Sequence, residues 1–130
     1  MKIKLTSVFV DDQDKALKFY TEKLGFVKKH DIPLGEAKWL TVVSPEEPNG
    51  TELLLEPSSN PAAQNYKKSI LGQGIPAAAF VVDDLQKEYA QLKKKGVEFT
   101  MEPTNMGTTT IAVLDDTSGN LIQLYQVTGA

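Results

Sequence analysis

The 130-residue sequence contains no cysteine and a single histidine, His30. The absence of cysteine excludes disulfides and thiolate chemistry and fits a reducing compartment, so we expect a cytoplasmic protein. A long apolar run is also missing, because the N-terminal one is soon interrupted by Asp11 and Asp12. We therefore expect neither a signal peptide nor a membrane-spanning segment.

Excess positive charge is absent as well, since the formal net charge is -3 at pH 7. Phosphate binding requires a clustered basic surface, so nucleic acid is not expected as a partner. The densest basic run, residues 93–95, is typical of the solvated C-terminal end of a helix. Apolar residues make up 41% of the chain and charged residues 24%, which indicates an ordinary soluble globular domain.

The sequence does contain an internal repeat. Residues 4–12 and 75–84 are each a short apolar run that closes on two aspartates, and each is followed by a helix-like segment and a glycine. Aligning Asp12 with Asp84 gives an offset of 84 − 12 = 72 residues. The repeat predicts one structural unit used twice along the chain.

Each copy predicts a strand, a helix and then three strands. In the first copy the strands are expected at 3–10, 26–32, 37–43 and 51–56, with a helix between Asp12 and Gly25 and a break at Pro33. In the second they are expected at 77–82, 97–101, 108–114 and 121–127, with a helix between Asp84 and Gly96 and a loop over 103–107.

The fold class expected is therefore α+β, with two βαβββ modules forming one curved mixed sheet, a cup with the helices outside. We expect a single domain over 1–130, with module one at about 1–57 and module two at about 75–130. The segment at about 58–74 is a linker or a lid, with a short helix over 61–70 that Asn60 opens.

Several motifs have the spacing of a known family. They are Val10-Asp11-Asp12 with Ala16-Leu17-Lys18-Phe19-Tyr20 and Leu24-Gly25-Phe26, then Phe80-Val81-Val82-Asp83-Asp84 with Gly96-Val97, and finally Asp115-Asp116-Thr117-Ser118-Gly119-Asn120. Over nearly the whole chain the sequence resembles the glyoxalase, bleomycin-resistance and extradiol-dioxygenase superfamily, also called vicinal oxygen chelate proteins. The resemblance implies paired βαβββ modules, a cup and a homodimer.

In the metalloenzymes of that family, one residue from the first strand and one from the last strand of each module hold a divalent cation, usually His or Glu. On the resemblance these positions fall on Leu5, Leu54, Ala77 and Gln123. Three of them have no donor atom and the amide oxygen is a weak substitute, whereas a catalytic metal site normally keeps at least three protein ligands. His30 matches none of the positions, and we expect it to be a structural residue.

We therefore expect no cofactor, and a divalent metal is the alternative. That alternative depends on the register of residues 51–56, because a slip of two residues would bring Glu52 or Glu56 to the ligand position.

Strand alternation points a mixture of apolar and polar side chains into the cup, as in small-molecule sites. The alternative is a cup filled by its own side chains or by a partner subunit, although two inward alanines favour an open one. Carboxylates near aromatic rings would suit a cationic ligand. The predicted ligand-binding residues are Ser7, Phe9, Trp39, Glu52, Leu54, Glu56, Ala77, Ala79, Gln123 and Tyr125.

The sequence thus predicts a metal-independent small-molecule binding protein, sequestering or resistance-like, and it indicates no catalytic residue. Its expected partners are a small organic molecule and a second copy of the chain. One alternative is a metal-dependent lyase, isomerase or dioxygenase of the glyoxalase type. Another is a dimeric interaction module with a vestigial cup.

Overall fold

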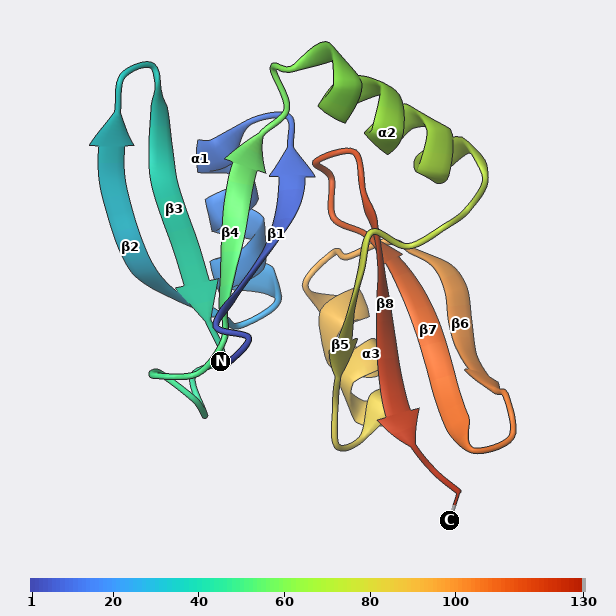
Figure 1. Cartoon of the computed structure of the whole chain (residues 1–130). Coiled ribbons are helices and arrows are strands. Elements are labelled where there is room, and N and C mark those ends of the chain that lie inside the picture. The colour runs from blue at the N-terminus through green and yellow to red at the C-terminus, as the bar shows by residue number, and fades with distance from the viewer. Residues whose placement is uncertain (130) are drawn as a thin grey trace. The chain divides into compact units, whose positions relative to one another are not determined.

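A computed structural model describes residues 1–129, and the chain divides into a first unit, Met1–Lys67, and a second unit from Lys68 onward (Figure 1). The first unit contains β1 (Leu5–Val10), α1 (Gln13–Lys18), η1 (Phe19–Lys23), β2 (Val27–Leu34), β3 (Ala37–Val43) and β4 (Glu52–Pro57). Helix α2 (Pro61–Gly72) crosses the boundary. The second unit contains β5 (Ala78–Val81), α3 (Leu85–Lys94), β6 (Phe99–Asn105), β7 (Thr109–Asp115) and β8 (Leu121–Val127).

Each unit has its own four-stranded mixed sheet with the same strand order, β1-β4-β3-β2 in the first and β5-β8-β7-β6 in the second. The outer pairs β1–β4 and β5–β8 are parallel, and the remaining pairs are antiparallel. Helix α1 lies against β3 and β4, and α3 lies against β6, β7 and β8. The α+β class and the two βαβββ modules are confirmed, whereas a cup made from both sheets stays a prediction.

The helix starts follow the repeat. Asp12 accepts a hydrogen bond from the backbone N–H of Lys15, and Asp84 accepts one from the N–H of Lys87, each at 3.1 Å. Both aspartates are in extended conformation, as N-cap residues are. Helix α2 also begins as predicted, because Asn60 Oδ1 accepts the Ala62 N–H at 2.8 Å.

The first helix does not end as an α-helix, which the sequence pattern did not indicate. Its last residues form the π-helical segment η1, and Gly25 ends it with a φ of 85°. The wider turn still places Phe19 and Tyr20 in the core, where Tyr20 meets Phe19 edge-on and stacks on Phe26.

Two prolines lie within strands that the sequence predicted to be interrupted. Pro33 belongs to β2 and Pro103 to β6, so the expected break and loop at these positions were wrong. Both strands are at the edge of their sheets, where a missing backbone N–H costs no ladder hydrogen bond.

The register between the first and last strands agrees with the repeat. Ser7 is opposite Leu54 in the first unit, and Ala79 is opposite Gln123 in the second. The slip of two residues that would move Glu52 to the position of Leu54 is therefore wrong. Alternate residues of these strands and their neighbours form the buried layers beneath the helices, namely Val8, Val10, Leu40, Val42, Leu53 and Leu55 in the first unit and Ala112, Leu114, Ile122 and Leu124 in the second.

Within residues 1–129, the structure has no helix with both the length and the apolar character needed to span a bilayer.

Candidate functional site

The predicted ligand-binding residues lie on the sheet faces turned away from the helices. The first inner face is defined by Leu5, Ser7, Phe9, His30, Trp39, Thr41, Glu52, Leu54 and Glu56. The second inner face is defined by Ala77, Ala79, Val81, Leu121, Gln123 and Tyr125. The structure brings each set together within its own unit, because side chains two residues apart on a strand share a face.

Exposure differs among the predicted residues. Ser7 and Ala79 are exposed, whereas Leu54 is only 5% exposed. The other seven are half-buried: Phe9, Trp39, Glu52, Glu56, Ala77, Gln123 and Tyr125.

A cluster of three polar side chains, here called the Glu52 cluster, joins β2, β3 and β4 on the first inner face. Thr41 Oγ1 donates a hydrogen bond to Glu52 Oε1 at 2.8 Å and accepts one from the His30 backbone N–H at 3.2 Å. The His30 imidazole Nε2 lies 3.6 Å from the same carboxylate oxygen. Thr41 is fully buried, while the side chains of Glu52 and His30 are 20% and 43% exposed. The cluster therefore presents a fixed, partly accessible carboxylate.

A β-bulge brings His30 into this cluster. Lys28 is opposite Val42 and His30 is opposite Thr41, so Lys29 is an extra residue in β2. A bulge re-aims the side chains that follow it, and bulges are common beside functional sites. Sequence reasoning expected only a structural role for His30, because the bulge has no readable signal in this stretch. Glu52 was predicted, but its partners were not.

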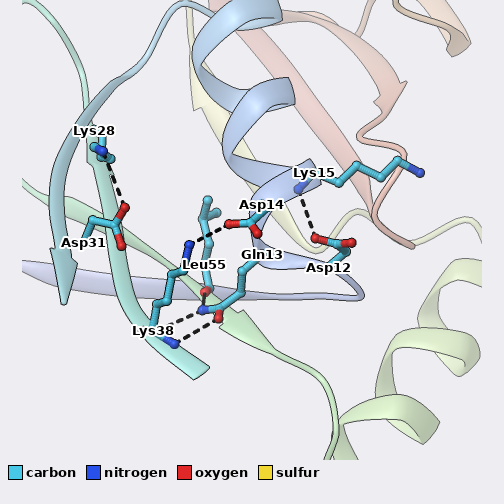
Figure 2. A network of polar contacts seen from close by, with 8 residues as sticks. All are labelled: Asp12, Gln13, Asp14, Lys15, Lys28, Asp31, Lys38 and Leu55. Carbon is cyan, nitrogen blue, oxygen red and sulfur yellow. Dashed lines mark hydrogen bonds and ion pairs between the residues drawn. The ribbon is translucent and has the colours of Figure 1, made fainter. Parts of the chain in front are cut away.

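The amide side chain of Gln13 is wedged between β3 and β4 (Figure 2). Its Nε2 donates to the carbonyl oxygens of Lys38 at 2.9 Å and Leu55 at 2.8 Å, and its Oε1 accepts the Lys38 N–H at 3.1 Å. These bonds take the place of strand-to-strand bonds, which is why the β3–β4 ladder pairs only Thr41 with Leu54 and Val42 with Leu53 among the described residues. The Gln13 amide, here called the wedge, separates β3 from β4 near the inner-face residues Trp39 and Glu56.

An ion pair between Lys38 and Asp14 lies beside the Gln13 amide. Lys38 Nζ lies 2.7 Å from Asp14 Oδ1, next to Gln13 in the sequence (Figure 2). The hydrogen bond and the charge of Asp14 raise the pKa of Lys38 above its usual 10.5. Both groups are solvent-exposed, so the pair contributes little to stability.

The residues at the inherited metal positions do not fit a metal centre. Leu5 and Leu54 lie on adjacent strands in the first unit and offer no donor atom, and in the second unit Ala77 offers none and Gln123 only a neutral amide. Across residues 1–129, no three His, Cys, Asp or Glu side chains are grouped as metal ligands would be. The Glu52 cluster has one carboxylate and one imidazole, fewer than the three protein ligands that catalytic zinc keeps.

Comparisons with known proteins agree with this architecture. The family model described as Glyoxalase/Bleomycin resistance protein/Dioxygenase superfamily matches residues 2–124. The uncharacterized protein YurT of Bacillus subtilis is 63% identical over 126 residues, covering 97% of this chain and 99% of the relative. A probable lactoylglutathione lyase of Synechocystis is 33% identical and covers 93% of this chain and 92% of its own length. TnmS3, an antibiotic binding protein from Streptomyces, superposes with a TM-score of 0.76 at 28% identity, covering 98% of this chain and 97% of its own.

Proposed function

Because the chain belongs to the glyoxalase, bleomycin resistance protein and dioxygenase superfamily, we propose that it binds a small organic molecule without a metal, as a sequestering or resistance-like protein. The observation that carries this proposal is the donor chemistry of the inherited metal positions, which are occupied by two leucines, an alanine and a glutamine. A Lewis-acid mechanism needs several hard or borderline ligands around the cation, and these side chains do not supply them.

The composition of the inner faces supports binding. Apolar residues such as Leu5 and Phe9 alternate with a few polar groups, including Glu52, Gln123 and Tyr125. In small-molecule sites apolar surface supplies affinity, and a small number of polar groups fix the orientation. The relationship to TnmS3, which is described as an antibiotic binding protein, is a further reason to favour this function.

A second candidate is a lyase of the glyoxalase type, which the description of the Synechocystis relative favours. In this family such chemistry depends on a divalent cation, so it would require ligands other than those at the inherited positions. A homodimer and a cytoplasmic location are further parts of the proposal. Light scattering of the purified protein would test the dimer.

Metal analysis separates the two functions. We expect the purified and dialysed protein to contain no stoichiometric zinc, nickel, iron or manganese, and to gain no lyase activity with the hemithioacetal of methylglyoxal and glutathione when these metals are added. If one equivalent of metal per chain stays bound and the protein turns over the substrate, the function is catalysis and the binding proposal is wrong.

A thermal-shift screen tests binding directly. Aromatic antibiotics, hydrophobic amines and glutathione conjugates form a suitable panel, because a ligand at a hundred times its Kd stabilises the fold by about 2.7 kcal/mol. Ser7→Trp fills the first inner face and Ala77→Trp fills the second, so the variant that abolishes the shift identifies the face that holds the ligand, whereas Ala90→Trp on the exposed side of α3 should preserve the shift. An unchanged shift in both Ser7→Trp and Ala77→Trp would place the ligand elsewhere.

A further inference from the structure

We propose that Glu52 is the polar anchor of the bound molecule and that it takes an ammonium group, which makes the ligand an organic amine with an apolar body. This inference rests on the proposed binding function and adds to it the chemical class of the ligand and the residue that selects it.

The orientation of the carboxylate is the first argument. Glu52 Oε1 accepts from Thr41 and faces the His30 imidazole, whereas Oε2 has no protein partner within residues 1–129. The threonine hydroxyl has a single proton, which it donates to Glu52, and its oxygen is occupied by the His30 N–H. One carboxylate oxygen is thus held in place while the other is available to a ligand donor.

The charges around Glu52 are the second argument. Two lysines near this end of the sheet are engaged with the turn between β3 and β4: Lys4 Nζ donates to the Asn49 carbonyl oxygen, and Lys29 Nζ donates to the Pro48 carbonyl oxygen at 2.6 Å. In the part of the chain that the structure describes, no lysine forms a salt bridge with Glu52. The carboxylate is therefore not paired with a lysine, and an ammonium group of a ligand can form a charge-assisted hydrogen bond with it, which is stronger than a neutral one.

The surroundings of Glu52 supply the apolar contact that such a ligand needs. Leu5 lies directly opposite on β1 and is 44% exposed. Glu56 is on the same face four residues further, about 13 Å along the strand, so it adds negative potential without competing for the same group. On the second inner face, β5 and β8 place no carboxylate, and Asp115 of β7, opposite Leu121, accepts the Thr117 backbone N–H at 2.7 Å.

Three probes with the same ring system test the inference. They are 2-naphthylmethylamine, 2-naphthylmethanol and 2-methylnaphthalene, whose affinities are measured by isothermal titration calorimetry. For the unmodified protein we expect the amine to bind at least about tenfold more tightly than the hydrocarbon, with the alcohol between them. Glu52→Gln keeps the shape and removes the charge, so the preference for the amine should vanish. Glu36→Gln removes an exposed carboxylate in the β2–β3 turn and should leave the preference unchanged.

Thr41 is expected to act as a positioning residue. Thr41→Val removes the hydroxyl that holds Glu52 and should lower the ratio of amine to hydrocarbon affinity severalfold, while Thr41→Ser restores the hydroxyl and should restore the ratio. A purely structural role would weaken all three probes by the same factor. If Thr41→Val fails to fold, Thr41→Ala removes the same hydroxyl and should lower the same ratio.

The outcomes are distinguishable. Equal affinities for the amine and the hydrocarbon in the unmodified protein would overturn the role of Glu52 while leaving small-molecule binding in place. An amine preference that persists in Glu52→Gln would overturn it in the same way. If none of the three probes binds, the inference fails, and the thermal-shift panel then decides the proposed function by itself.

Discussion

The two units have the same strand order but join their central strands differently. In the second unit the β7–β8 ladder runs from Thr109 opposite Val127 to Asp115 opposite Leu121. In the first unit the β3–β4 ladder is shorter, and the Gln13 amide bonds to both strands beside it. The repeat aligns Gln13 with Leu85, a fully buried residue that has no polar group to offer. One half-buried amide can therefore replace several strand-to-strand bonds, and it separates β3 from β4 where the inner face has Trp39 and Glu56.

The closing turns differ as well. In the second unit Asp116 is fully buried and accepts hydrogen bonds from the backbone N–H groups of Ser118 and Asn120 and from the Asn120 side chain, at 2.7, 3.0 and 2.9 Å. Aligning Gly119 with Gly50 gives Glu47 as its counterpart, which is exposed. The second unit thus fixes its turn internally, while the first uses Lys4, Lys29 and the backbone.

The largest effect on stability is expected from the buried turn. Asp116→Ala removes the acceptor of three donors and leaves them without it in a buried site, which should lower the free energy of unfolding by about 3 kcal/mol. Urea denaturation measures the change. Glu47→Ala, the matched change in the first unit, should stay within about 0.5 kcal/mol. Equal losses in both variants would contradict the difference between the turns.

The next largest loss of stability is expected from replacing Gln13. Gln13→Leu gives the first unit the residue of the second, and it leaves the Lys38 carbonyl, the Lys38 N–H and the Leu55 carbonyl without their amide partner. We expect a loss of about 2 kcal/mol, because unsatisfied buried backbone groups cost more than the added apolar contact returns. Urea denaturation again measures it. A variant as stable as the unmodified protein would mean that β3 and β4 close into a full ladder.

A smaller loss of stability is expected from removing the ion pair between Lys67 of α2 and Asp11. The ammonium group of Lys67, whose side chain is 5% exposed, pairs with Asp11, and Ser58 also donates to that carboxylate. Asp11→Asn should therefore cost about 1 kcal/mol. The repeat aligns Asp11 with the exposed Asp83, which forms no such pair among the described residues, so Asp83→Asn should be neutral in thermal unfolding. A larger loss in Asp83→Asn would reverse the comparison.

The smallest effect is expected from Asp14→Asn, which removes the ion pair beside the wedge. The pKa of Lys38 is raised in the folded protein, so the stabilisation is complete below 10.5 and is lost as the pH rises through the higher folded value. The difference in melting temperature between Asp14→Asn and the unmodified protein should thus disappear in strongly alkaline buffer. A difference that persists there would have a cause other than the charge of Lys38.

Most of the fold could be predicted from the repeat. Asp12 and Asp84 gave the helix starts, and Gly50 and Gly119 gave the correct register of the last strands. The π-helical end of the first helix and the strand positions of Pro33 and Pro103 were missed. These features depend on tertiary packing and on which strands are at the sheet edge. The local sequence pattern carries no information about either.

The site could be predicted only in part. Alternation placed Glu52, Leu54 and Glu56 on one face, because a period of two follows from strand geometry alone. The role of His30 depends on an extra residue in β2, and the role of Gln13 depends on the distance between two strands. Both are properties of the folded chain, so a single sequence gives no signal for either.

The Gln13 amide also gives the two units different routes to hydrogen exchange. The Lys38 amide proton is held by a side chain, so one change of rotamer at Gln13 exposes it to solvent while both sheets stay intact. Amide protons in the β7–β8 ladder need the strands themselves to part. In hydrogen exchange, the Lys38 amide in the first unit would therefore record the rotamer change at Gln13, and the β7–β8 amides in the second unit would record the parting of those strands.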